Sequence, residues 1–114
     1  MRSSAASDVY KRQIEGSVDF SVLFANVSIE KGAVVRDSIL MPGTVVKKGA
    51  VVQYAIVAEN AVIEENAVVG ERPEDMENLS DWGVAVVGAN VCIGAGTRVA
   101  PKAMVDEDLP EVTV

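Results

Sequence analysis

Histidine is absent from this 114-residue chain, and cysteine occurs only once, at Cys92. A single thiol excludes an internal disulfide, and the lack of histidine removes the commonest general base and zinc ligand. Lys and Arg number 10 against 17 Asp and Glu, and the net charge of −7 argues against a nucleic-acid surface. No apolar run approaches the ~18 residues of a membrane span. We therefore expect a one-domain cytoplasmic protein that binds neither nucleic acid nor membrane.

What the chain has instead is a repeat of 17 residues, which runs three times between Val18 and Val68. Each repeat divides into blocks of five, six and six residues, and each block begins with an aliphatic residue. We expect these aliphatic residues to form three inward-facing columns: Val18, Val35 and Val52; Leu23, Leu40 and Val57; Ile29, Val46 and Ile63.

The turn residues indicate how the chain bends between blocks. The fourth position of both six-residue blocks is always Gly or Asn, the residues that most easily adopt a positive φ: Asn26, Gly43 and Asn60; Gly32, Gly49 and Asn66. The five-residue block has Ser21, Ser38 or Ala55 instead, which predicts a different corner. Three strands and three corners per repeat predict a three-sided parallel solenoid. Three hairpins of a sandwich would need alternating polar residues and two-residue turns, which the blocks lack.

This hexapeptide pattern resembles that of the left-handed parallel β-helix, an all-β fold, and the handedness rests on that resemblance. Acyltransferases and carbonic anhydrases of this fold use histidines, so both activities are excluded here unless another polypeptide supplies the residue.

The residues that follow the inward positions distinguish the three faces of the solenoid. Two faces carry polar or charged residues: Asp19, Arg36 and Gln53; Glu30, Lys47 and Glu64. The remaining face carries Phe24, Met41 and Ala58. Single exposed apolar residues are common on protein surfaces, but a stacked stripe favours a docking interface.

We divide the chain into a foreign-looking or frayed leader (1–13), a β-helix (14–105) with a loop insertion (70–83), and an acidic C-terminal tail (106–114). The loop holds five carboxylates. Its Glu74 and Asp75 are candidates for a metal or acid–base site, but a solvated loop that replaces two sides of a coil, anchored by Trp82, is the preferred interpretation.

Six-residue blocks resume at Val87 and end near Val105. Asn90 and Gly96 recover the corner position, whereas Lys102 is predicted to break it. Cys92 stands beside inward-pointing Ile93, which favours a structural thiol over a reactive one. The acidic tail is either a terminal cap or an untethered end.

Three stretches resemble the C-terminal domain of bacterial glucose-1-phosphate adenylyltransferase (ADP-glucose pyrophosphorylase): SVLFANVSIEKGAVVRDSILMPGTVVKKGAVV, AIVAENAVIEENAVVG and NLSDWGVAVVGANVCIGAGTRV. The strings DSILMPGTVV and DWGVAVVG are more specific than the hexad itself. The resemblance covers about Gly16 to Val105.

The resemblance implies a regulatory and oligomerisation domain, with catalysis in an N-terminal nucleotidyltransferase domain that uses Mg²⁺ with ATP. The family's catalytic Arg-Leu-x-Pro-Leu-Thr motif does not occur here, so we assign no catalytic, cofactor or metal residue to this chain. The expected partners are that catalytic domain and other copies of the chain, in a tetramer.

Five cations are available for sugar-phosphate effectors, but they are better explained as solvated surface charges, and we assign none of them a binding role: Arg36, Lys47, Lys48, Arg98 and Lys102. Two alternatives to the adenylyltransferase remain. One is the matching domain of another sugar-nucleotide transferase, such as mannose-1-phosphate guanylyltransferase. The other is a stand-alone β-helix scaffold.

Overall fold

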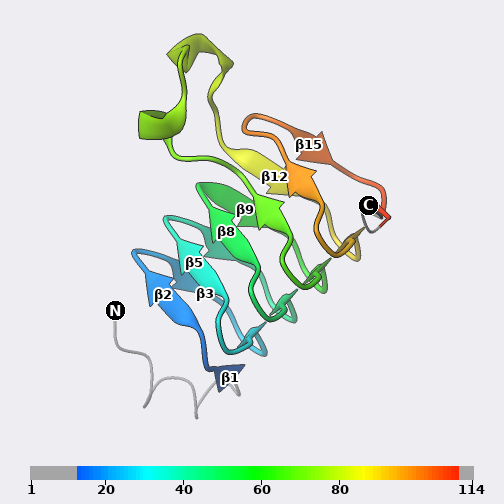
Figure 1. The fold of residues 1–114 in the computed structure, drawn as a ribbon. Coiled ribbons are helices and arrows are strands. Elements are labelled where there is room, and N and C mark those ends of the chain that lie inside the picture. Colours follow the sequence, from blue (N-terminus) through cyan, green and yellow to red (C-terminus); the bar gives the residue numbers. More distant parts are fainter. Residues whose placement is uncertain (1–12, 111–114) are drawn as a thin grey trace.

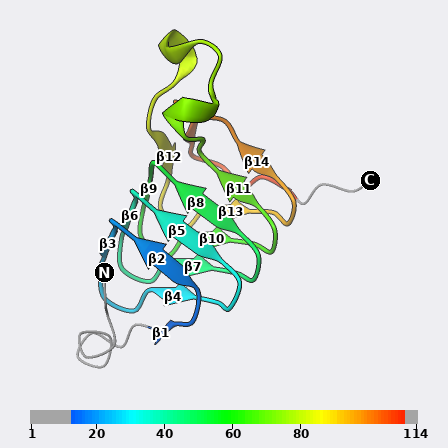
Figure 2. The ribbon, with the colours of Figure 1, turned by 60° about the vertical axis from the view of Figure 1, so that its left-hand side comes forward.

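The computed structural model describes residues 13–110, which form a solenoid of triangular coils (Figure 1). Each side of the triangle is a five-stranded parallel sheet, and Figure 2 shows the strands of each sheet stacked along the solenoid axis. Sheet A contains β1 (Gln13–Ile14), β4 (Ser28–Ile29), β7 (Val45–Val46), β10 (Val62–Ile63) and β13 (Cys92–Ile93). Sheet B contains β2 (Ser17–Asp19), β5 (Val34–Arg36), β8 (Val51–Gln53), β11 (Val68–Val69) and β14 (Arg98–Val99). Sheet C contains β3 (Val22–Leu23), β6 (Ile39–Leu40), β9 (Ala55–Val57), β12 (Ala85–Val87) and β15 (Met104–Val105).

The strands pair in the register that the 17-residue repeat predicts. Val18 pairs with Val35 and Val35 with Val52, and the other two aliphatic columns pair in the same way. Eight of these nine side chains are buried, and Val18 packs against the core from the first coil. The prediction of an all-β, left-handed parallel β-helix is confirmed.

The corners are where the sequence prediction was incomplete. All six predicted Gly and Asn positions have positive φ. The third corner also has positive φ, but it falls on the residue before the serine, at Phe20, Asp37 and Tyr54 (47°, 49° and 48°). The serines accept backbone hydrogen bonds from the next coil: Ser21 Oγ from Ser38 N, and Ser38 Oγ from Ala55 N, each at 3.2 Å. These bonds help to hold successive corners together.

Lys102 does not break its corner, contrary to the sequence prediction. Its φ is 71°, and its backbone N–H donates to the Gly83 carbonyl at 2.9 Å. Its ammonium group also donates to the Ser80 carbonyl at 3.0 Å. These two contacts with the loop offset the cost of a left-handed lysine.

The loop insertion occupies one corner only, so the prediction that it replaces two sides of a coil is wrong. Tyr54 alone joins sheet B to sheet C in the preceding coil, whereas residues 71–84 make the same connection between β11 and β12. The loop contains two short 3-10 helices, η1 (Pro73–Asp75) and η2 (Leu79–Asp81). It projects from the solenoid in Figure 1.

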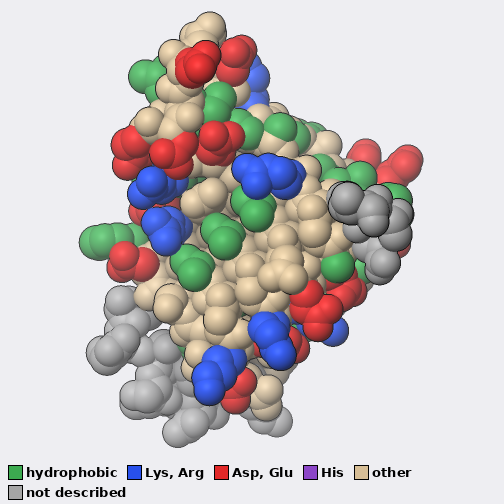
Figure 3. Space-filling view, in the orientation of Figure 1, with side chains coloured by type: hydrophobic (Ala, Val, Ile, Leu, Met, Phe, Trp, Pro, Cys, Tyr) green, Lys and Arg blue, Asp and Glu red, His purple; other side chains and the backbone are tan. Residues whose placement is uncertain are grey.

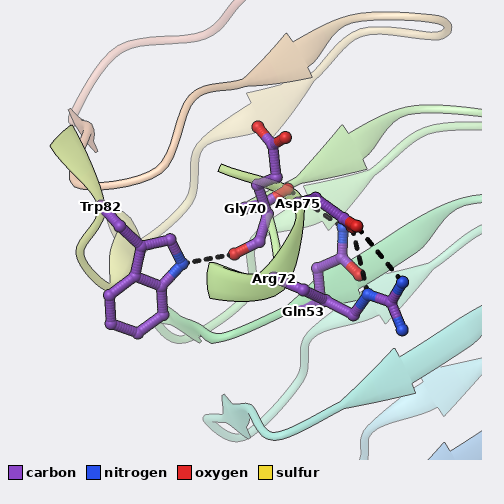
Figure 4. Close-up of polar contacts among 6 residues, drawn as sticks. Gln53, Gly70, Arg72, Asp75 and Trp82 are labelled. Atoms are coloured by element: carbon purple, nitrogen blue, oxygen red, sulfur yellow. Dashed lines mark hydrogen bonds and ion pairs between the residues drawn. The ribbon is translucent and has the colours of Figure 1, made fainter. Parts of the chain in front are cut away.

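Polar contacts hold the base of this loop (Figure 4). The Trp82 indole N–H donates to the Glu71 carbonyl at 2.6 Å, and the Trp82 ring packs edge-on against Tyr54 with centroids 5.5 Å apart. Gln53 donates to the carbonyl of Gly70 at 3.2 Å. Trp82 therefore anchors the loop to the solenoid, as its position predicted.

Candidate functional site: an apolar face on sheet C

Two outward columns of apolar residues cover sheet C. The first column is formed by residues that pair with one another across all five strands: Val22, Ile39, Ile56, Val86 and Met104. The second column follows the inward residues of the first four strands: Phe24, Met41, Ala58 and Gly88. Over the first four strands neither column contains a polar or charged side chain, and after β15 the second column ends at the exposed Asp106. We call these nine residues the sheet C face.

The predicted interface residues lie next to one another in this face. The Phe24 N–H donates to the Leu40 carbonyl at 3.0 Å, and the Met41 N–H donates to the Val57 carbonyl at 2.9 Å. The Ala58 N–H continues the ladder by donating to the Val87 carbonyl at 2.8 Å. Phe24, Met41 and Ala58 therefore project from adjacent rungs of one sheet, at the spacing of neighbouring strands.

The face is most exposed at its two ends. Val22 is 53% exposed and Phe24 43% exposed in the first coil, and Met104 is 78% exposed in the last. Between them, Ile39, Ile56 and the other members are half-buried by their neighbours in the stack. At the first coil, a shallow groove is lined by Val22, Leu23, Phe24, Ala25 and Pro42.

Sequence reasoning missed the first and larger column. It considered only the residue after each inward position, although the residue before an inward position points outward as well. The signal was present in the sequence, because the residue before each inward aliphatic residue of sheet C is itself Val or Ile: Val22, Ile39 and Ile56.

The outward columns of the other two sheets are mixed. Sheet B carries Val34, Val51 and Val68 between Ser17 and Arg98, beside a column of Asp19, Arg36 and Gln53. Sheet A carries Val45 and Val62 between Ser28 and Cys92, beside a column of Glu30, Lys47 and Glu64. Figure 3 shows a row of hydrophobic side chains that leads to a basic one on the visible face, with acidic groups on the loop.

The chemically active side chains do not assemble into a catalytic or metal site. Asp75 of the predicted pair pairs with Arg72 at 3.1 Å, while Glu74 is exposed. This contact with Asp75 raises the pKa of Arg72. Over residues 13–110, no group of three or more acidic or cysteine side chains is placed to hold a metal ion.

Cys92 lies in the outer column of sheet A, and its thiol donates to a Glu64 carboxylate oxygen at 3.4 Å. Desolvation, followed by the Glu64 carboxylate, raises the pKa of the Cys92 thiol. A protonated thiol is a poor nucleophile, which agrees with the structural role that the sequence favours.

The five candidate effector cations are spread over the solenoid. Arg36 and Arg98 lie on sheet B, at β5 and β14, with two strands between them. Lys47 follows β7 on sheet A, and Lys48 and Lys102 lie at corners. In the described part of the chain, no helix is long and apolar enough to cross a membrane.

A family model described as GlmU-like, C-terminal hexapeptide matches residues 12–87, well over half of the chain. The matched stretch covers β1 to β12, which are the first four coils, together with the loop insertion in the fourth. It therefore includes four of the five strands that form the sheet C face. On this evidence the chain belongs to the GlmU-like C-terminal hexapeptide family, whose β-helix fold it adopts.

Proposed function

We propose that this β-helix is the regulatory and oligomerisation domain of a glucose-1-phosphate adenylyltransferase. That enzyme joins ATP and glucose 1-phosphate into ADP-glucose and pyrophosphate for glycogen synthesis. Catalysis, with Mg²⁺ bound to ATP, belongs to a nucleotidyltransferase domain that packs against the sheet C face. The β-helix itself supplies a rigid surface for that packing and for assembly of subunits into a tetramer.

The sheet C face is the observation that carries this proposal. Two columns of Val, Ile, Met and Phe form an extended apolar surface, and such surfaces are typical of protein interfaces. Each aliphatic side chain transferred from water contributes on the order of 25 cal/mol per Å² of apolar area buried. A sheet face with no charged residue over its first four strands is therefore better suited to a permanent neighbour than to solvent.

The position of the adenylyltransferase-like strings supports the same assignment. The string DSILMPGTVV, residues 37–46, contains β6, and the string DWGVAVVG, residues 81–88, contains β12. Both strands belong to sheet C, where they pair with β9 from either side. The two most specific points of resemblance thus lie on the face that we assign to the partner domain.

The first test is the coding sequence upstream of the codon for Ile14 at the natural locus. We expect an in-frame nucleotidyltransferase with a glycine-rich loop that continues into Arg-Leu-x-Pro-Leu-Thr. An in-frame stop codon immediately upstream, or a domain of another kind, would contradict the proposal. A guanylyltransferase at that position would favour the mannose-1-phosphate enzyme instead.

The second test measures the reaction of the whole enzyme that this locus encodes. Purified enzyme should release pyrophosphate from ATP and glucose 1-phosphate in the presence of Mg²⁺. GTP with mannose 1-phosphate is the matched control. Turnover with the control pair alone would overturn the assignment.

A further inference from the structure

After β15 the chain continues from sheet C to sheet A, as in the earlier coils, and Leu109 pairs with the edge strand of sheet A. Leu109 pairs with Ile93 in a single parallel bridge. The Leu109 N–H donates to the Cys92 carbonyl at 2.9 Å, and the Gly94 N–H donates to the Leu109 carbonyl at 2.7 Å. Residues 108–110, which we call the C-terminal strap, therefore occupy the place of a next coil on β13.

The three strap residues make three different contacts. Asp108 accepts a hydrogen bond from the Cys92 N–H at 2.8 Å, where a strand would offer a backbone carbonyl. Leu109 is partly buried and packs against the hydrophobic core. The Pro110 carbonyl accepts a hydrogen bond from the Thr97 hydroxyl at 2.9 Å. The edge of β13 and its surroundings thus contact three groups in order: the acceptor side chain of Asp108, the aliphatic side chain of Leu109 and the backbone carbonyl of Pro110.

The strap is held less firmly than any coil. It pairs through one residue on one sheet, whereas successive coils pair through two or three residues on all three sheets. Within residues 13–110, β14 and β15 are paired on one side only. A groove beside the strap is lined by Glu64 and Glu65, so that acidic Asp108 lies beside like charges. Short, exposed pairings of this kind open most readily in native proteins.

We propose that the edge of β13 is a strand-addition site, which the C-terminal strap fills in cis and which an extended peptide of the same pattern binds in trans. Backbone hydrogen bonds at a sheet edge give affinity for any extended chain, and the pockets for alternate side chains give selectivity. The ligand class is an extended segment in which an acceptor side chain precedes an aliphatic residue, and the strap is its built-in competitor. This site is separate from the sheet C face and does not rest on the function proposed above.

A tethered competitor weakens binding by its effective concentration, which reaches about millimolar for a short linker. Releasing the strap should therefore uncover a site that the intact chain conceals. The reactivity of the Cys92 thiol reports on release of the strap, because the Cys92 N–H and carbonyl both form hydrogen bonds with the strap. The thiol itself donates a hydrogen bond to Glu64.

The binding test uses the full chain with Leu109→Asp, which removes the aliphatic anchor of the strap. The probe is a fluorescent peptide of residues 106–114, DEDLPEVTV, followed by polarisation. We expect the variant to bind it at least about tenfold more tightly than the wild-type chain. The same peptide with Asp in place of its Leu should bind neither protein. A folded variant that fails to bind, or that binds both peptides equally, would overturn the proposal.

A milder variant keeps the test decisive if Leu109→Asp does not fold. Asp108→Ala removes one strap contact and leaves the edge of β13 intact, and Glu107→Ala removes a neighbouring exposed carboxylate for which no such contact is seen. The readout is the rate at which iodoacetamide alkylates Cys92. Asp108→Ala should react several-fold faster than the wild type, partly because the Asp108 carboxylate helps to raise the pKa of Cys92. Release of the strap is therefore read from the slower rate when the peptide is added, and Glu107→Ala should match the wild type. Equal alkylation rates in all three proteins would refute the proposal that the strap covers this edge.

Discussion

Sheet C and sheet B have the same inward architecture and opposite outward surfaces. Both bury one column of aliphatic residues, and both present two outward columns. On sheet B one outward column is polar, with Arg36 between Asp19 and Gln53, whereas on sheet C both columns are apolar over the first four strands and only Asp106 follows the last one. The fold needs only the inward column. We attribute the difference between the outward columns to the partner that we propose for sheet C.

If the outward columns serve a partner, the inward residues of all three sheets should supply most of the stability of the solenoid. Ile63 is fully buried in sheet A, and Ile63→Ala should lower the free energy of unfolding by about 2–5 kcal/mol, because a cavity remains in a packed interior. Urea unfolding followed by circular dichroism measures this loss. A loss below about 1 kcal/mol would mean that the inward columns are not the main source of stability.

The predicted interface residues test the outward surface of sheet C itself. Phe24→Asp with Met41→Asp should leave the β-helix folded but weaken association with the catalytic domain at least about tenfold per residue, or about 1.4 kcal/mol each. Limited proteolysis between the two domains measures their packing, and sedimentation of the whole enzyme measures the assembled fraction. If both are unchanged in the double variant, these two residues do not belong to the interface.

Glycines at corners with positive φ should contribute to the free energy of unfolding whichever sheets they join. Gly49 has a φ of 75°, and a Cβ atom there would collide with the Asn66 side-chain oxygen of the next coil. Gly49→Val should therefore destabilise the chain by ~1–3 kcal/mol, through strain and the clash together. Gly49→Asn keeps the clash but tolerates a positive φ, as Asn66 does, so a smaller loss in this variant measures the part due to backbone strain. Thermal unfolding that is unchanged in the valine variant would contradict this account of the corners.

The loop between the two sheets should contribute least to global stability. Trp82→Phe keeps the ring next to Tyr54 but removes the hydrogen bond to the Glu71 carbonyl, which should cost ~0.5–1.5 kcal/mol. Hydrogen exchange should rise in residues 71–84 and stay constant in β8 and β9. Faster exchange throughout the solenoid would show that the loop supports the coils as well.

The sequence predicted the inward side of the molecule well, because repeated burial imposes a strict period. The columns of Val35, Leu40 and Ile29 follow from spacing alone, and the left-handed corners follow from Gly and Asn. The positive φ of the third corner could not be predicted in this way, because Phe20 and Tyr54 are residues that rarely adopt it. Backbone hydrogen bonds between coils, such as that from the Tyr54 N–H to the Arg36 carbonyl, stabilise this corner, and the sequence carries no local sign of them.

The outward side was predicted only in part. Phe24, Met41 and Ala58 were identified, but the column of Ile39 and Ile56 was overlooked. The strap at Leu109 was also not foreseen as a strand, since it pairs through a single residue and no periodic signal extends that far. Surface features of this kind depend on which segments meet in space, and periodicity does not report that.

The most direct test of the central claim compares matched substitutions on the two sheets in the whole enzyme. Ile39→Asp with Ile56→Asp places two carboxylates on sheet C, and Val34→Asp with Val51→Asp places two on sheet B, in the same coils and at outward positions. Limited proteolysis between the two domains shows whether they remain packed together, and light scattering gives the mass of each enzyme. We predict that the sheet C variant is cleaved between its domains faster than the wild type, whereas the sheet B variant matches the wild type. Equal cleavage rates and equal masses for both variants, with both folded, would contradict the assignment of sheet C as the partner face.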